Sequence, residues 1–345
     1  MSPGVADLVA FSNYSPQAGS TRVRLYDWID HLGLRARAQC YAGLPNSRPA
    51  TLLRHLPAVI AAERELRRLD VRGERVIVSR SASPLSRGEL ENRILREAAH
   101  SVYDFDDAVH LVTSWRDRVG GAPEKFATCV RTADTVLAGN NHLADVASEL
   151  SDNVVMVPSC VEPDDYLPKG DWTLPSRPRV VWVGSAATEE YLLDVLPALD
   201  RLWREGGIEL KVISTGRPNP RFGDRPWITY VPWTAATAAA ALREADVAVA
   251  PLTDTAFARG KCAYKLLQYA ATGLPIVGSP VGANRLALER FGGSIAERDW
   301  YEPLKTLLTA SAGSRQAMGE RGIAMVRRWY SFEAWAPTWR AAVGL

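Results

Sequence analysis

Short, continuous runs of apolar and β-branched residues alternate along the chain with longer segments in which apolar positions recur every three to four residues. The continuous runs are typical of strands buried on both faces of a parallel sheet, and the longer segments are typical of amphipathic helices. This alternation predicts an α/β fold built from strand–helix–strand units. In the first half of the chain we expect strands at residues 7–12, 36–41, 75–79, 101–105, 135–138 and 154–158.

A proline-rich stretch then interrupts the alternation. Four prolines between residues 163 and 178 break any helix there, and the polar residues among them offer little to pack, so we expect an interdomain linker. A second series of strands follows it, and this series also has the pattern of a buried parallel sheet. Its strands are expected at residues 179–184, 210–214, 228–231, 247–252, 275–279 and 293–296.

The two series predict two Rossmann-like, doubly wound parallel-sheet domains, one over residues 1–165 and the other over 178–330. Sheets of this kind bind ligands beyond the carboxyl ends of their strands, so we expect the domains to face a cleft. The last segment, 331–345, is predicted to be a helix that begins after a break near Ser331. Its aromatic residues indicate that it packs back on the first domain.

The composition narrows the class of protein. The chain has 345 residues, 47% of them hydrophobic, which is enough to bury two cores. The net charge of +2, with basic and acidic residues interleaved, argues against a nucleic-acid-binding protein. Asp7 interrupts the first apolar stretch and no apolar run is long enough to cross a bilayer, so we expect a cytoplasmic protein without a signal peptide. Contact with a membrane surface stays an open alternative, and no obligate protein partner is indicated.

The most informative chemistry lies in residues 247–282, where a buried strand is followed by a polar loop and a helix. The N-terminus of a helix offers N–H groups and the positive end of the helix dipole, both of which favour an anion. Lys261 and Lys265 are four residues apart and are expected on one face of this helix, with Gln268 beside them and Arg259 just before. This edge suits a nucleoside diphosphate; the alternative is a solvated basic helix start.

The run RGKCAYKLLQYAATGLPIVGSPVGAN in this region resembles the donor-site segment of the family 4 (formerly group 1) glycosyltransferases. The segments SPQAGSTRVRLYDWIDHLG, VYDFDDA, LAGNNHLAD and VVWVGSAATEEYLLDVLPAL resemble further parts of that family, in its order. The resemblance implies a GT-B fold and a retaining enzyme of the hexosyltransferase type. Such an enzyme moves a sugar from a nucleotide-diphosphate sugar, its co-substrate, to a hydroxyl of a small-molecule or glycan acceptor. The resemblance implies neither a cofactor nor a metal.

The resemblance also assigns candidate site residues in both domains. As catalytic residues we expect Arg259, Lys261, Lys265, Asp106 and Asp107. As donor-binding residues we expect Gly184, Ser185, Arg217, Trp233, Asp254, Gly260 and Gln268. On the acceptor side we expect Gly19, Ser20, Arg22 and Asn140, where the alternatives are a plain turn for Gly19-Ser20 and a helix cap for Asn140.

Two positions depart from the family's pattern. Many members carry a pair of glutamates where this chain has Gly260 and Gln268. Gln268 can still hydrogen-bond a ribose hydroxyl through its amide, whereas Gly260 has no side chain that could reach the sugar. Many members also have a basic residue after the strand that corresponds to residues 180–184, where this chain has Gly184-Ser185-Ala186. Arg259, Lys261 and Lys265 must therefore carry more of the diphosphate charge.

Three aspartates lie at the end of a predicted strand, and they admit three interpretations: Asp104 within the strand, and Asp106 and Asp107 directly after it. The D-x-D spacing resembles the metal motif of the other major glycosyltransferase fold, and it also resembles the nucleophile loop of haloacid-dehalogenase-like phosphatases. The further carboxylates that such a phosphatase needs are not found along the chain. We favour hydrogen bonding to the acceptor by Asp106 or Asp107 over loop stabilisation, and we expect no metal there.

Two other functions remain alternatives to transfer. Nucleotide-sugar 2-epimerases share the two-domain architecture, and Asp106 and Asp254 could act as their acid and base. The missing glutamate pair instead favours a non-catalytic nucleotide-sugar-binding protein. Product formed without an acceptor would distinguish the first alternative, and binding without turnover would distinguish the second.

Overall fold

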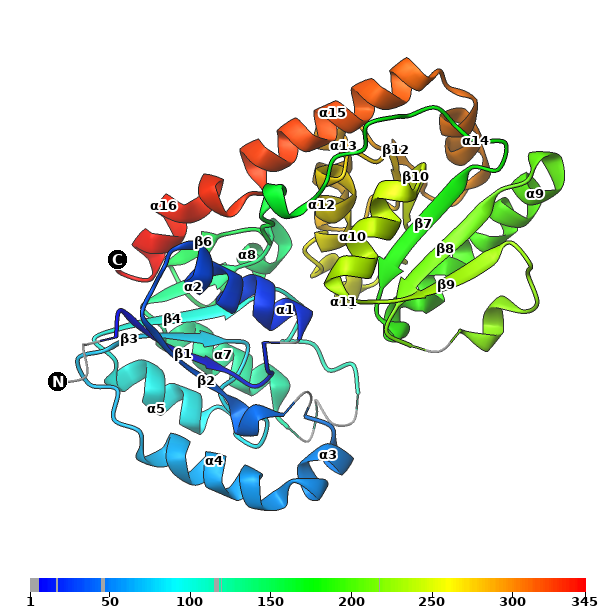
Figure 1. The fold of residues 1–345 in the computed structure, drawn as a ribbon. Helices are drawn as coiled ribbons and strands as arrows, with labels where there is room; N and C mark the ends of the chain where they lie inside the picture. Colours follow the sequence, from blue (N-terminus) through cyan, green and yellow to red (C-terminus); the bar gives the residue numbers. More distant parts are fainter. Residues whose placement is uncertain (1–5, 17, 45–46, 115–117, 119, 217) are drawn as a thin grey trace. The chain divides into compact units, whose positions relative to one another are not determined.

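The computed structural model describes the chain except for residues 1–5, 17, 45–46, 115–117, 119 and 217. The described residues form two compact units. The first unit contains the chain up to Cys160, together with Arg259–Cys262 and Trp335–Leu345. The second unit contains Val161–Ala258 and Ala263–Ala334. Each unit is built on its own six-stranded sheet, and every strand pair in both sheets is parallel (Figure 1).

The sheet of the first unit has the order β2-β1-β3-β4-β5-β6. Its strands are β1 (Leu8–Ser12), β2 (Ala36–Cys40), β3 (Arg75–Ser79), β4 (His100–Phe105), β5 (Thr135–Ala138) and β6 (Val154–Met156). The central strands β1, β4 and β5 are buried almost throughout, which explains their continuous apolar sequences. The edge strand β2 is partly exposed and accordingly carries arginine and glutamine.

Helices cover both faces of this first sheet (Figure 1). They are α1 (Gly19–Thr21), the π-helix η1 (Arg22–Tyr26), α2 (Asp27–His31), η2 (Tyr41–Gly43), α3 (Pro49–Arg54), α4 (Leu56–Arg68), α5 (Glu89–Glu97), α7 (Ala122–Thr132) and α8 (Asn141–Ser148). Buried residues of α4, α5 and α7 share one core with alternate residues of the strands, such as Val9 and Phe11 of β1. The alternation follows from the two-residue period of a strand.

The sheet of the second unit has the order β12-β11-β10-β7-β8-β9. Its strands are β7 (Arg179–Gly184), β8 (Glu209–Ser214), β9 (Ile228–Pro232), β10 (Val247–Ala250), β11 (Ile276–Gly278) and β12 (Ser294–Ile295). Its helices are η3 (Pro163–Asp165), η4 (Ala186–Asp194), α9 (Leu196–Gly206), η5 (Pro220–Phe222), α10 (Ala235–Glu244), α11 (Ala256–Arg259), α12 (Tyr264–Ala271), α13 (Ala283–Phe291), α14 (Tyr301–Thr309) and α15 (Ala312–Trp329). The two parallel sheets confirm the predicted fold class, and all twelve predicted strands are present.

The sequence predicted that the proline-rich stretch is a linker with little packing. In the structure this stretch is packed. Residues 161–178 belong to the second unit, and Val161, Pro163, Lys169 and Trp172 among them are buried. The Nε1 of Trp172 donates to the carbonyl of Gly273 at 2.9 Å. The Nζ of Lys169 lies 3.2 Å from a carboxylate oxygen of Asp246. The prolines do prevent a long helix, but the segment still packs through these nonlocal partners.

The C-terminal break falls at Ser331, where the sequence predicts it. Helix α15 ends at Trp329, and α16 (Phe332–Ala342) begins after Ser331, whose hydroxyl accepts a hydrogen bond from the amide of Ala334 at 3.1 Å. Within the first unit, Trp339 of α16 stacks on Trp28 with ring centroids 5.3 Å apart. Both indoles are fully buried, so this pair contributes to the core of that unit.

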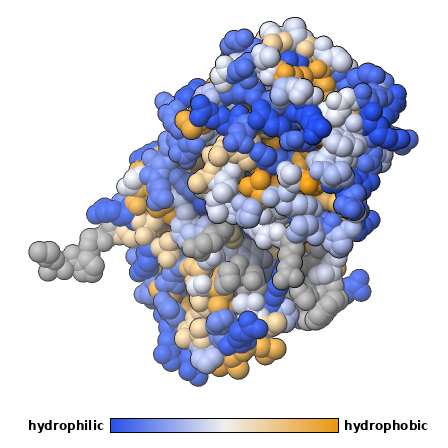
Figure 2. All heavy atoms as spheres, turned by 45° about the vertical axis from the view of Figure 1, so that its right-hand side comes forward, coloured by the Kyte–Doolittle hydropathy of each residue, from blue (hydrophilic) through white to orange (hydrophobic). Residues whose placement is uncertain are grey.

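The surface is mixed in character. Figure 2 shows hydrophobic residues reaching the surface in small groups that are separated by hydrophilic ones. Across the described part of the chain, no helix combines the length and the apolar character that crossing a membrane requires.

Candidate functional site

A buried ion pair supports the carboxyl end of β4. The carboxylate of Asp104 accepts hydrogen bonds from Arg24 Nη2 at 2.5 Å and from Ser79 Oγ at 3.2 Å. Arg24 also donates from Nη1 to the carbonyl of Val157 at 2.6 Å. Burial raises the pKa of Asp104, and the charge of Arg24 opposes that rise. Asp104 therefore ties β3 and β4 to the π-helix η1, and its carboxylate already has internal partners.

Arg80, Asp106, Asp107 and Lys261 form a cluster of alternating charges, which we call the Arg80 cluster. Arg80 Nη2 lies 2.6 Å from Asp106 Oδ1, and Arg80 Nε donates to the same oxygen at 2.7 Å. Asp107 Oδ2 lies 3.6 Å from Arg80 Nη2, and Asp107 Oδ1 lies 3.8 Å from Lys261 Nζ. All four residues belong to the first unit, because Lys261 lies in the Arg259–Cys262 segment.

Arg80 has a strained backbone that its neighbours hold in place. Its φ of 62° lies in the left-handed region, which a side-chain-bearing residue rarely adopts. Its amide donates to the carbonyl of Asp104 at 2.8 Å, and its carbonyl accepts from the hydroxyl of Tyr103 at 3.1 Å. Strain of this kind is concentrated at functional sites, where the surrounding structure over-determines it. Here it directs the guanidinium to the two aspartates.

The two aspartates of the Arg80 cluster differ in their remaining hydrogen-bonding capacity. The carboxylate of Asp106 is in close contact with two nitrogens of Arg80, Nε and Nη2. The contacts of Asp107 with Arg80 and Lys261 are longer than a hydrogen bond, and its carboxylate accepts a hydrogen bond from the adjacent amide of Ala108 at 3.2 Å. Burial raises the pKa of Asp107, while Arg80 and Lys261 oppose the rise. Of these two aspartates, Asp107 is thus the one with more capacity to accept hydrogen bonds from a ligand.

Asn140 holds the Arg259–Cys262 segment within the first unit. Its Oδ1 caps α8 by accepting from the amide of Leu143 at 2.8 Å, as the sequence suggested. Its Nδ2 donates to the carbonyls of Gly260 at 3.0 Å and Lys261 at 3.1 Å. The thiol of Cys262, whose pKa is raised by burial, donates to the carbonyl of Asp106 at 3.2 Å. Asn140 therefore positions the residues beside Asp107.

Gly260 lies against the loop that follows β4, and this packing requires a glycine. A Cβ at this position would lie 2.8 Å from both the backbone nitrogen and the Cβ of Ala108, closer than real Cβ atoms approach. Replacing Gly260 by Ala is therefore expected to displace the segment and to lower the free energy of unfolding by about 2 kcal/mol. Urea unfolding measures this change. Gly206→Ala is the control, because a Cβ there meets nothing within 4 Å; equal stability of both variants would contradict the packing argument.

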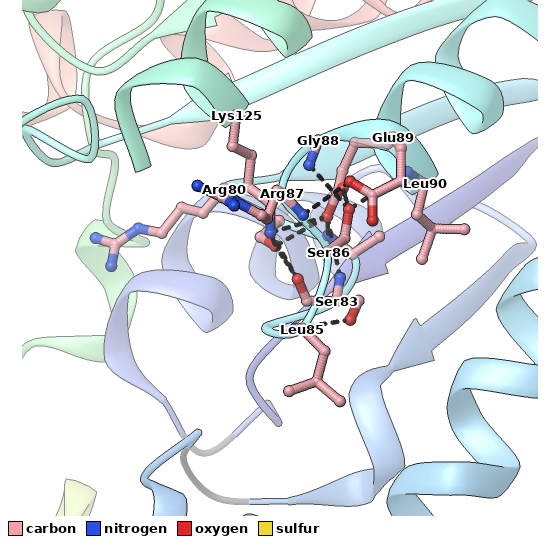
Figure 3. Close-up of polar contacts among 12 residues, drawn as sticks. Arg80, Ser83, Leu85, Ser86, Arg87, Gly88, Glu89, Leu90 and Lys125 are labelled. Carbon is pink, nitrogen blue, oxygen red and sulfur yellow. Dashed lines mark hydrogen bonds and ion pairs between the residues drawn. The ribbon is translucent and has the colours of Figure 1, made fainter. Parts of the chain in front are cut away.

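A buried carboxylate organises the serine-rich loop that follows Arg80. Glu91 is fully buried and accepts from the amides of Ala82 at 3.0 Å and Ser83 at 3.1 Å, and Lys125 Nζ lies 3.3 Å from it. Burial acts to raise the pKa of Glu91, but Lys125 and these hydrogen bonds hold it below its usual value. In Figure 3, Lys125 lies over this loop, whereas the side chain of Arg80 extends away from it. These contacts hold the loop that begins directly after Arg80 in place.

Sequence reasoning missed Arg24, Arg80, Glu91 and Lys125. A signal existed for Arg80, since it directly follows a buried strand just as the aspartates follow β4. The pairing of β3 with β4 was needed to place the two strand ends side by side.

The other predicted acceptor-side residues lie at the start of the helices after β1. Gly19 and Ser20 form α1, and a Cβ on Gly19 would meet nothing within 4 Å, so packing does not require this glycine. Arg22 begins η1, and its Nε lies 3.7 Å from a carboxylate oxygen of Asp27.

The predicted common helix face of Lys261 and Lys265 is wrong. Helix α12 begins at Tyr264, because Ala263 has a φ of 56° and interrupts the helical backbone. Lys265 lies in the first turn of α12, in the second unit, and its Nζ is 5.2 Å from the centroid of the Trp182 ring. Gln268 lies one turn further along the same helix and is half-buried.

Two of the predicted donor-binding residues, Gly184 and Ser185, lie at the end of β7. A Cβ on Gly184 would lie 2.5 Å from the ring of Trp182, so glycine is needed for the indole to pack there. Ser185 follows directly and accepts through its carbonyl from the amide of Thr188 at 2.9 Å. Trp233 is half-buried and packs against the core of the second unit. Asp254 and Arg259 are exposed. Arg217 lies outside the described residues.

Two carboxylates near the end of β4 are paired with arginines. Arg24 pairs with Asp104, and Arg80 pairs with Asp106. Within the described ranges, no three His, Cys, Asp or Glu side chains come together in a way that could hold a metal ion.

Residues 177–308 match the model of a family described as glycosyl transferases group 1. The matched range contains all six strands of the second sheet and helix α12 with Lys265 and Gln268. A comparison with curated proteins gave no match. The second unit therefore carries a group 1 glycosyltransferase domain, and the chain is an enzyme of the glycosyltransferase class.

Solved structures with the same fold cover nearly the whole chain. A sucrose-phosphate synthase from Thermosynechococcus elongatus superimposes with a TM-score of 0.68 at 13% identity, over 97% of each chain. An α,α-trehalose-phosphate synthase (UDP-forming) from Burkholderia vietnamiensis gives 0.66 at 14% identity, over 99% of each chain. HepE from Anabaena, in complex with UDP and glucose, gives 0.72 at 11% identity, over 98% of this chain and 99% of that one. These similarities confirm the predicted GT-B fold.

Proposed function

We propose that the protein is a retaining glycosyltransferase that moves a sugar from a nucleotide-diphosphate sugar to an acceptor hydroxyl without a bound metal. The group 1 glycosyltransferase match over residues 177–308 is the observation that carries this proposal. Similarity to HepE, whose structure contains UDP and glucose, supports a nucleotide sugar as the donor. We assign donor binding to the second unit and acceptor binding to the first.

The donor assignment rests on α12 and the end of β7. When the bond between the sugar and the diphosphate breaks, negative charge grows on the leaving oxygen, and cations already in place stabilise it. Lys265 lies in the first turn of α12, where the helix dipole adds to its charge. Gly184 is half-buried and Ser185 is exposed at the end of β7. Arg259 and Lys261, the other cations predicted for the diphosphate, lie in the first unit, so the donor assignment does not rest on them.

The acceptor assignment rests on Asp107. Its carboxylate has remaining acceptor capacity and can receive hydrogen bonds from sugar hydroxyls. Retention needs no protein base, because the leaving phosphate oxygen can take the proton of the acceptor hydroxyl on the same face. Arg80 already neutralises the neighbouring Asp106, which favours this role over metal binding.

Release of the nucleoside diphosphate in the presence of nucleotide sugars and an acceptor panel tests the proposal. We expect transfer that requires an acceptor and persists in excess EDTA. Activity abolished by EDTA and restored by magnesium or manganese would contradict metal independence. A sugar epimer formed without acceptor would instead favour the epimerase, and binding without turnover across the panel would favour a binding protein.

Replacing Lys265 by Ala is expected to raise the donor dissociation constant about tenfold, because one charge-assisted contact to phosphate is lost. Isothermal titration with the nucleoside diphosphate measures the change. Lys211→Ala is the matched control, since this lysine of the same unit forms a surface ion pair with Glu244 at 2.9 Å. Equal affinities of the two variants would remove Lys265 from the donor site.

A further inference from the structure

Helices α3 and α4 expose an unusual amount of apolar side chain. The two helices are consecutive and are separated only by His55, whose backbone is not helical. Among the described residues, eight large hydrophobic side chains are exposed, and three of them lie here: Leu53 at 71%, Leu56 at 47% and Ile60 at 41%. A single exposed leucine is ordinary, but three within eight residues form a patch.

On α4, the patch lies on a face of the helix that does not pack into the core. Val59 and Leu66 are buried and pack into the core of the first unit. Leu56, Ile60 and Arg64 are four residues apart and therefore share another face of the helix, and all three are exposed. In Figure 2, orange residues lie beside blue ones at the lowest part of the view, where α3 and α4 lie in Figure 1. These three exposed side chains therefore do not belong to the core of the first unit.

The charges around this patch are predominantly positive. Arg54, Arg64, Arg67 and Arg68 are exposed, and Glu65 is the exposed acid among residues 53–68. Glu63 is largely covered and lies 3.5 Å from Arg67. An apolar helix face with arginines beside it is typical of a helix that lies in the plane of a membrane surface. Anionic lipids attract such arginines, each of which strengthens binding about fivefold.

We propose that Leu53, Leu56 and Ile60, together with Arg64 and Arg68, form a docking surface for an anionic lipid bilayer. The helices, of 6 and 13 residues, are too short to span a bilayer and would lie in its interface. A second copy of the chain fits this surface less well. A two-fold contact would place the patch against itself and set arginines against arginines. The proposal goes beyond sugar transfer and does not depend on it.

Co-sedimentation of the full chain with vesicles tests the proposal. We expect binding to phosphatidylcholine vesicles that contain phosphatidylglycerol, and only weak binding to phosphatidylcholine alone. Changing Leu53, Leu56 and Ile60 together to Ser should lower the partition coefficient at least about tenfold, because apolar area is no longer buried in the interface. Arg64→Gln with Arg68→Gln should lower it about 25-fold at low salt. High salt should weaken wild-type binding, since it screens the charges.

Leu167→Ser is the matched control, because this leucine of the second unit is 60% exposed and lies outside the patch. It should bind vesicles like the wild type, and circular dichroism should show that all variants are folded. Equal binding to both kinds of vesicle, or unchanged binding by the triple-serine variant, would overturn the proposal. A wild-type dimer that the triple-serine variant loses, without vesicle binding, would identify a second copy as the occupant and overturn it as well.

Discussion

Replacing Asp107 by Asn is expected to lower kcat/KM for the acceptor about 50-fold, because a charged acceptor of hydrogen bonds becomes neutral. The donor dissociation constant should change much less, since donor binding is assigned to the second unit. Initial rates at varied acceptor concentration, combined with titration of the nucleoside diphosphate, separate the two effects. The shape of the side chain is retained, so the charge is the main property that changes.

The pH profile provides a second measurement of the same group. Burial raises the pKa of Asp107 above its usual value. The carboxylate therefore becomes protonated, on lowering the pH, earlier than an ordinary aspartate would. Activity that needs the charged form should fall as the pH drops through this raised pKa, and Asp107→Asn should remove that acid limb.

Asp70→Asn is the control for this pair of measurements, because Asp70 is an exposed aspartate of the same unit. It should leave the rate and the pH profile unchanged. Arg80→Lys keeps the positive charge but loses the guanidinium fork that contacts Asp106. This variant therefore tests whether the fork's contact with Asp106 affects the acceptor kcat/KM. If Asp107→Asn retained the full acceptor kcat/KM, the acceptor assignment would be wrong.

The fold was predictable because buried parallel strands leave a strong local signal. Strands such as β1 and β5 are buried on both faces, and their sequences are continuous apolar runs. The proline-rich stretch was misinterpreted for a physical reason as well. Trp172 and Lys169 pack through Gly273 and Asp246, and partners so distant in the chain cannot be inferred from local polarity.

The candidate site was only partly predictable. The aspartates after β4 and Asn140 follow strand ends, where ligand-binding residues of parallel sheets collect. The contact of Arg80 with Asp106 depends on the pairing of β3 with β4, which a sequence does not state. The start of α12 was misplaced because Ala263 adopts a left-handed backbone, and alanine gives no sign of that conformation.

Replacing Arg24 by Met is expected to lower the free energy of unfolding by about 3–5 kcal/mol, because it leaves the buried carboxylate of Asp104 without its cation. Both side chains are almost completely inaccessible to solvent, so water cannot replace the lost partner. Thermal unfolding should show the loss as a decrease of about 10 °C in the midpoint of the first unit. Nucleotide binding to the second unit should be retained.

A double-mutant cycle separates the ion pair from simple packing. Asp104→Asn removes the buried negative charge, so in the Arg24→Met background it should restore part of the lost stability rather than add to the loss. Arg35→Met is the control, because Arg35 pairs with Asp7 at 2.9 Å on the exposed surface of the same unit, where an ion pair contributes little. Purely additive losses in the double variant would show that Arg24 acts through packing and through its bond to Val157, not through Asp104.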